Sequence, residues 1–138
     1  MEDLKGKVAY ITGGSKGIGL GIARELVNSG MRVAISGRGA SDLENAVALL
    51  GPENAMGIIS DVTRLEDEIS AVEKIIDRWG QLDVVVANAG VGHFAPIDEL
   101  EASAWHQMIN TNLNGVYHTL MASMDPLKAS KGYYITIA

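Results

Sequence analysis

The sequence predicts an α/β protein with a doubly wound parallel sheet, that is, a sheet with helices on both of its faces. Five short apolar runs alternate with segments whose apolar residues recur every three or four positions. A glycine-rich turn follows the first apolar run directly and opens the first helical segment. The 138 residues are enough for one domain, 1–138, with its own core.

The five apolar runs are expected to be the strands of this sheet. The fourth, LDVVVA, is almost continuously apolar, which is typical of a strand buried on both faces. Helices between the strands then require parallel strands and right-handed crossovers. The predicted strands are residues 7–12, 31–36, 56–60, 82–87 and 132–138.

Four helical segments connect these strands. The first runs from Ile18 to Gly30, and the last spans roughly Ala102 to Met124. The motifs SDLE at 41–44 and TRLE at 63–66 predict capping boxes for the two helices between them. The third helix is expected to bury one apolar stripe, which consists of Leu65, Ile69, Val72, Ile76 and Trp79.

Composition excludes several kinds of partner and site. The net charge of −6, without a basic stripe, argues against nucleic acid and anionic membranes. The absence of cysteine excludes disulfides and thiolate metal sites and favours a cytoplasmic protein. No run approaches membrane-spanning length. No metal site is expected either, because metal-ligand spacing is missing from His93, His106 and His118.

The glycines of the first turn indicate a close approach to the backbone. Gly13, Gly17 and Gly19 have the spacing G-x-x-x-G-x-G between a strand and a helix. Free N–H groups at such a helix N-terminus can bind a pyrophosphate. The alternative is that these glycines serve only tight packing of the helix on the strand, and the position of the turn favours the ligand.

Four motifs, in order along the whole chain, resemble the short-chain dehydrogenase/reductase family. They are TGGSKGIG at 12–19, DV at 61–62, NAG at 88–90 and NTNLNG at 110–115. The resemblance implies a Rossmann-like fold that binds a nicotinamide dinucleotide, with 3-oxoacyl-(acyl-carrier-protein) reductases as similar enzymes. The cofactor residues that it implies are Thr12, Gly13, Ser15, Lys16, Gly17, Ile18, Gly19, Arg38, Asp61, Val62, Asn88, Ala89 and Gly90.

The roles of these residues differ along the pocket. By resemblance, Asp61 accepts a hydrogen bond from the adenine amino group and Val62 lies beside the ring. Asp61 is expected to be free for this role, because Thr63 and Glu66 already cap the next helix. By resemblance, too, Asn88 first supports the central strand and only then contacts the cofactor.

The end of the second strand indicates NADP(H) as the cofactor. Gly37 stands where members that prefer NAD tend to carry an acid, and Arg38 follows it. Lys16 matches a second basic position that is common in NADP-dependent members. The alternative is that both cations are merely solvated. Two cations without a nearby acid favour a 2′-phosphate.

Asn112 is the candidate catalytic residue. It shares a helical stripe with apolar neighbours, so a buried amide that needs partners is expected. By resemblance, it is the catalytic-tetrad asparagine, which anchors a water in a proton relay. The alternative is an asparagine that the nearby backbone satisfies. The Ser and the Tyr-x-x-x-Lys of the tetrad are expected after residue 138, so this part alone is predicted to be inactive.

The complete enzyme is expected to transfer hydride between NADP(H) and a carbonyl or secondary alcohol carbon of a small molecule. By resemblance, it is a homo-oligomer, either a dimer or a tetramer. The fifth strand is expected to be an exposed apolar edge of this part. Two alternatives stay open: a non-catalytic NADP(H)-sensing module and an NAD-dependent sugar-nucleotide epimerase.

Overall fold

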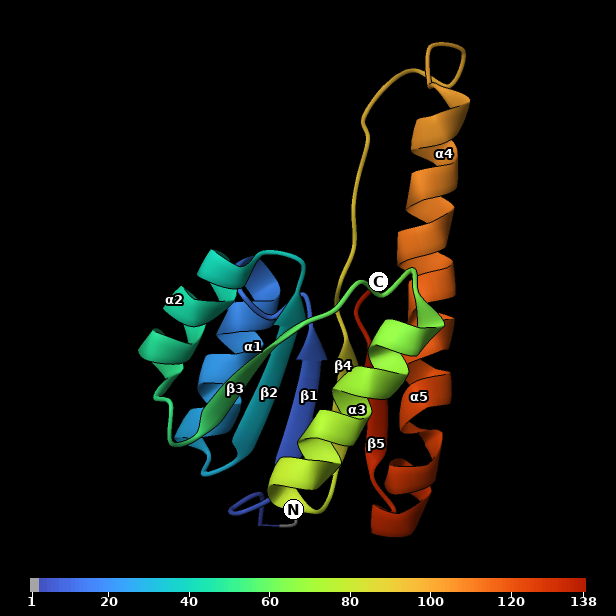
Figure 1. The fold of residues 1–138 in the computed structure, drawn as a ribbon. Coiled ribbons are helices and arrows are strands. Elements are labelled where there is room, and N and C mark those ends of the chain that lie inside the picture. The colour runs from blue at the N-terminus through green and yellow to red at the C-terminus, as the bar shows by residue number, and fades with distance from the viewer. Residues whose placement is uncertain (1–2) are drawn as a thin grey trace.

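The structure, a computed structural model, describes residues 3–138 as a five-stranded parallel sheet covered by helices on both faces (Figure 1). The strand order is β3-β2-β1-β4-β5, so the chain winds outward from β1 and then returns to β1's other side. This confirms the predicted fold class, and every predicted strand lies within two residues of its place. The strands are β1 Val8–Thr12, β2 Arg32–Gly37, β3 Ala55–Ile59, β4 Val84–Ala87 and β5 Tyr133–Thr136.

Alternate residues of β1 face two separate cores. Ala9 and Ile11 pack toward α1 and α2, whereas Val8 and Tyr10 pack toward α3 and α5. All four side chains are almost completely buried, as expected for the central strand of a two-sided sheet. The helices are α1 Gly17–Asn28, α2 Ala40–Leu50, α3 Leu65–Trp79, α4 Ala102–Ile109 and α5 Gly115–Ser130, with a π-helical segment η1 Asn110–Asn114 before α5.

Neither predicted capping box forms. Gly39 and Arg64 are the N-cap residues of α2 and α3, and no side chain caps either helix. Thr63 turns to Asp61 instead of the helix, and Glu66 pairs with the guanidinium of Arg64 at 3.0 Å. The prediction was wrong about where the helices begin. α2 begins at Ala40, so Ser41 lies inside it, and the N-cap of α3 is Arg64, so Thr63 lies one residue too early to cap that helix.

The predicted apolar stripe of α3 is displaced around the helix. Ile69 is 43% exposed, and Glu68 is completely buried in the face that packs on the sheet. Ala71, Val72 and Ile75 complete this buried face. The apolar spacing alone predicted a helix correctly, but it did not show that a carboxylate shares the buried face.

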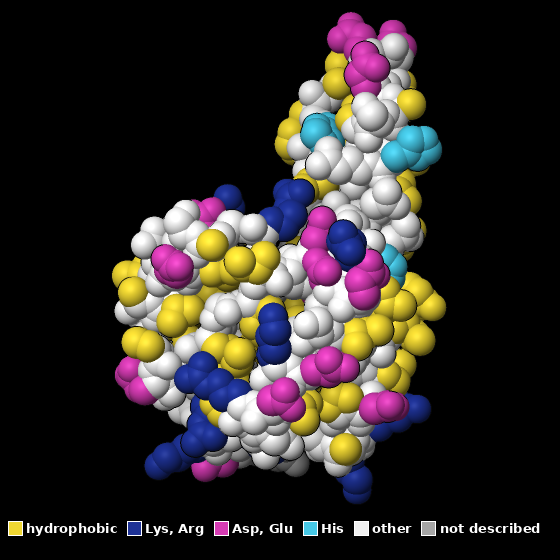
Figure 2. All heavy atoms as spheres, in the orientation of Figure 1, with side chains coloured by type: hydrophobic (Ala, Val, Ile, Leu, Met, Phe, Trp, Pro, Cys, Tyr) yellow, Lys and Arg dark blue, Asp and Glu magenta, His cyan; other side chains and the backbone are white. Residues whose placement is uncertain are grey.

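The predicted helix 102–124 is longer than expected and is interrupted. α4 and α5 are joined by η1, and the helical region continues to Ser130. With the preceding loop, α4 projects beyond the body of the sheet (Figure 1), and acidic side chains gather at its tip (Figure 2). No residue of α4 is buried, so the apolar stripe that Asn112 was expected to share has no core to face along this helix.

β5 forms one edge of the sheet, as expected. Tyr133 is 66% exposed and Ile135 is 45% exposed on this strand. Among residues 3–138, no helix combines the length and the apolar character that crossing a bilayer requires.

The C-terminus of α5 allows a test of backbone strain. Lys131 has φ +54°, the only left-handed residue other than glycine among residues 3–138. We expect Lys131→Gly to raise the free energy of unfolding by about 0.5–1 kcal/mol, because glycine adopts this conformation without a Cβ clash. Lys128→Gly is the matched control, since it removes the same charge inside the helix and should lower stability by about 1 kcal/mol. Urea unfolding of the full-length protein measures both, and a loss of stability in Lys131→Gly would contradict the expectation.

Candidate functional site

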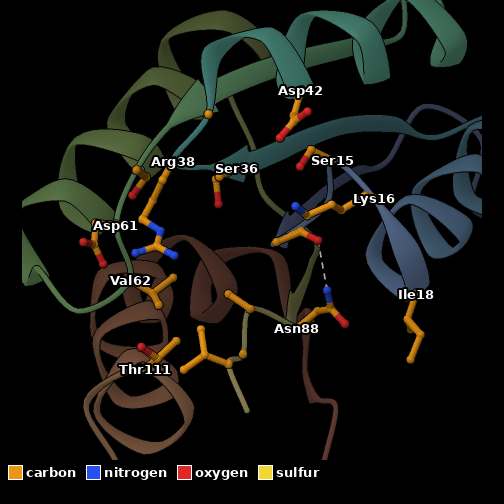
Figure 3. Close-up of a pocket in the computed structure, with 17 residues that line it drawn as sticks. Ser15, Lys16, Ile18, Ser36, Arg38, Asp42, Asp61, Val62, Asn88 and Thr111 are labelled. Carbon is orange, nitrogen blue, oxygen red and sulfur yellow. Dashed lines mark hydrogen bonds between the residues drawn. The ribbon is translucent and has the colours of Figure 1, made fainter. Parts of the chain in front are cut away.

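A cavity of about 540 Å³ opens where the carboxyl ends of the strands meet (Figure 3). It lies over the boundary between β1 and β4, where the chain reverses its direction across the sheet. Open α/β sheets bind their ligands at this position. The cavity brings together most of the predicted cofactor residues: Gly13, Ser15, Lys16, Ile18, Arg38, Asp61, Val62, Asn88, Ala89 and Gly90.

Thr12, Gly17 and Gly19 do not line the cavity. The hydroxyl of Thr12 accepts hydrogen bonds from the backbone N–H groups of Asn88 and Ala89, both at 3.0 Å. Gly17 opens α1 with a φ of +59°, and Gly19 is buried behind the turn. These residues therefore do not face the cavity but set the backbone conformation of the segments that line it.

The turn between β1 and α1 is hydrogen-bonded to Asn88, the residue that directly follows β4; we call it the pinned turn. The Asn88 amide donates to the carbonyl oxygens of Thr12 at 3.2 Å and Gly13 at 3.1 Å. A Cβ on Gly13 would lie 2.9 Å from the Ala89 Cα, and one on Gly19 would lie 2.3 Å from the Gly13 oxygen. Both glycines are thus required by close approach of backbone to backbone.

The N-terminus of α1 points a set of free donors at this cavity. The first N–H groups of a helix have no partner within the helix and carry partial positive charge. Ser15, Lys16 and Ile18 flank this end and line the cavity, and Ile18 is 67% exposed. The arrangement suits an anionic group of a ligand.

Asp61 is not free, contrary to expectation. Its Oδ1 accepts hydrogen bonds from the Thr63 N–H at 2.9 Å and the Thr63 hydroxyl at 2.8 Å. Partial burial opposes ionisation of Asp61, but these two bonds and the charges of Arg38 and Arg64 outweigh it and lower the pKa of the carboxyl. Asp61 therefore presents a carboxylate at the edge of the cavity.

Sequence reasoning missed several residues of the lining. Ser36, Asp42 and Ser60 line the cavity, as do Gly37, Gly39, Val91 and Thr111. Asp42 corrects the expectation that the Arg38 region has no acid nearby. Its position in the first turn of α2, four residues after Arg38, was the signal available in the sequence.

Asn112 lies beside the cavity but is exposed, so the expected buried amide was wrong. Its Oδ1 accepts from the Val91 N–H and its Nδ2 donates to the Val91 oxygen, both at 2.8 Å. Asn112 thereby fixes the backbone that directly follows Asn88–Gly90. The nearby backbone thus satisfies the side chain, and the catalytic role of Asn112 stays a prediction.

The histidines take part in local contacts. His118 donates from Nδ1 to the Val62 oxygen at 2.7 Å, because a carbonyl can only accept. His93 Nε2 lies 2.7 Å from the Gln107 oxygen. No group of three or more His, Cys, Asp and Glu side chains is placed for a metal ion within residues 3–138.

The chain matches the short chain dehydrogenase family over residues 7–138. An uncharacterized oxidoreductase of Staphylococcus saprophyticus is 37% identical over 143 residues, covering 100% of this chain and 61% of the relative. The chain thus spans about three fifths of the length of this relative.

Two solved structures have the same fold. One is an alcohol dehydrogenase from the archaeon Thermococcus sibiricus complexed with 5-hydroxy-NADP, with a TM-score of 0.89, 40% identity and coverage of 94% of this chain and 57% of the other. The other is a 3-ketoacyl-(acyl-carrier-protein) reductase from Brucella melitensis complexed with NADH, with a TM-score of 0.93, 28% identity and coverage of 98% and 58%. The parallel sheet, the pinned glycine turn and the match over residues 7–138 together place this chain in the short-chain dehydrogenase/reductase family.

Proposed function

We propose that this chain is the dinucleotide-binding part of an NADP(H)-dependent oxidoreductase. The whole protein would transfer hydride between the nicotinamide and a carbonyl or secondary alcohol carbon of a small molecule. The observation that carries the proposal is one cavity that holds a glycine turn with a helix N-terminus, a guanidinium and a carboxylate, in that order along its wall.

The lining fits a dinucleotide along its length. The turn at 13–19 would hold the pyrophosphate, because it leads into the N-terminus of α1, whose first N–H groups have no partner within the helix. Asp61, kept ionised by Thr63, would accept from the adenine amino group, with Val62 against the ring. Asn88, Ala89 and Gly90 would border the nicotinamide end, where the bound cofactor supplies the hydride chemistry.

The choice of NADP(H) rests on charge. Arg38 and Lys16 line the cavity and can bind the 2′-phosphate. Asp42, which also lines it, can accept from a ribose hydroxyl and favours NAD(H) instead. The neighbours are divided in the same way, since one was solved with an NADP derivative and one with NADH. Asp61 also lines the cavity, but Thr63 already binds its carboxylate, so Arg38 and Lys16 face Asp42 alone, and this balance favours NADP(H).

The other expectations for the whole protein stay predictions. These are a small-molecule carbonyl or alcohol substrate, a homo-oligomeric assembly, a cytoplasmic location and the inactivity of this part alone. Asn112 is proposed to act in catalysis from the position in which Val91 holds it. A sensing module would bind NADPH without turnover, and an epimerase would prefer NAD.

The packing of Gly19 gives a first test of the cofactor site. We expect Gly19→Ala to raise the Kd for NADPH more than about 100-fold, because a Cβ would lie 2.6 Å from the Asn88 Nδ2 and displace the turn. Gly21→Ala in the same helix is the control, since its Cβ would meet no atom within 4 Å apart from its chain neighbours and the backbone of its own helix. Calorimetric titration of the full-length protein measures both. Normal NADPH affinity in Gly19→Ala would show that the pinned turn is not needed for binding.

Arg38 tests which dinucleotide is preferred. We expect Arg38→Ala to raise the Kd for NADPH by about 10–100-fold, because a charge-assisted hydrogen bond to the 2′-phosphate is lost. The Kd for NADH should change less than about twofold, since NADH lacks this phosphate. Arg24→Ala, an exposed arginine of α1, is the matched control and should change neither. Equal losses for both dinucleotides would refute the assigned NADP(H) preference.

A further inference from the structure

The side chain of Glu68 is completely buried between the sheet and α5, although glutamates are rarely buried without a partner. The ion pairs observed among residues 3–138 do not include Glu68. A buried carboxylate without a cation has to be stabilised by hydrogen-bond donors. These donors connect Glu68 to the cavity described above.

Three hydroxyl groups from three different elements reach the Glu68 carboxylate. Tyr10 on β1 donates to Oε2 at 2.9 Å, and Thr119 on α5 donates to Oε1 at 2.8 Å. Ser60, which follows β3, donates to Oε2 through a short hydrogen bond. Burial raises the pKa of Tyr10 well above its ordinary value, and the charge of Glu68 raises it further, so Tyr10 keeps its proton.

Two members of this network also line the cavity. Both Ser36 on β2 and Ser60 line it. Ser60 belongs to the network through its bond to Glu68, and Ser36 belongs to it because its hydroxyl lies 3.0 Å from the Tyr10 hydroxyl. Ser36 comes two residues before Arg38, and Ser60 comes directly before Asp61. The backbone N–H of Ser60 also donates to the Gly37 oxygen at 3.0 Å. Glu68 thus contacts the end of β3 directly through Ser60 and the end of β2 indirectly through Tyr10 and Ser36. These two strand ends lead into Asp61 and Arg38, the charged groups of the cavity that they carry.

We propose that Glu68 is a positioning residue for the adenosine half of the dinucleotide, acting through Ser36 and Ser60. This inference rests on the proposed dinucleotide site and adds to it the group that holds the Arg38 and Asp61 segments in register. One buried acid shared by three elements orders these segments before the ligand arrives. The segments that carry Arg38 and Asp61 then lose less conformational entropy when the dinucleotide binds.

Glu68→Gln tests the proposal in the full-length protein. An amide has only one oxygen to accept from the three hydroxyls, and its NH₂ group faces another donor. We expect the Kd for NADPH to rise about tenfold, while the number of sites per chain stays the same. The Kd for 2′,5′-ADP, a probe of the adenosine half, should rise by the same factor. Glu73→Gln, an exposed glutamate on α3, is the matched control and should change neither.

Smaller substitutions keep the test decisive if Glu68→Gln does not fold. Ser60→Ala and Tyr10→Phe each remove one hydroxyl from the network and should each raise both Kd values about threefold or more. Calorimetric titration separates the Kd from the number of sites. A merely structural role would instead lower the number of sites and leave the Kd of the remaining sites unchanged.

The outcomes are distinguishable. Unchanged affinity in folded Glu68→Gln, or in both single-hydroxyl variants, overturns the inference. So does a loss of sites at constant Kd, or a change for NADPH that 2′,5′-ADP does not share. If the wild-type protein binds no NADPH at all, the proposed function itself fails.

Discussion

The cavity depends on how closely the β1–α1 turn approaches β4. The Asn88 amide holds two carbonyl oxygens of this turn, and the Thr12 hydroxyl holds two N–H groups of the segment after β4. A Cβ at Gly19 would fill the space between them. Because the first turn of α1 is fixed in this way, its unpaired N–H groups point to the place where the strands end.

The side of the cavity that follows β3 is also fixed in place, in this case by contacts with α5. α5 packs against Val62 so closely that a Cβ on Gly115 would lie 2.6 Å from the Val62 Cγ2. His118 of the same helix binds the Val62 oxygen, and Thr119 binds Glu68. Most groups that face the cavity therefore lie at strand ends and in the turns that follow them, and side chains outside the cavity hold these segments in place.

Much of this arrangement could be predicted from the sequence, because it depends on local patterns. Continuous apolar runs located the strands, and the glycine spacing located the turn and its helix. The errors concern side chains whose partners are distant or compete with one another. Thr63 binds Asp61 and not its helix, and Asn112 is satisfied by a loop twenty-one residues away in sequence. The sequence did not reveal Glu68 as a buried residue, because its hydroxyl partners lie on β1, after β3 and on α5.

The π-helical segment that contains Asn112 has a geometric consequence for the arm formed by α4. A π turn accommodates one residue more than an α turn, so it changes the rotational phase of the helix by about 100°. The extra residue thus sets the direction in which each face of the arm points relative to the body. Deleting one residue from η1 would leave the side chains of α4 unchanged but would turn a different face of α4 toward the body of the protein.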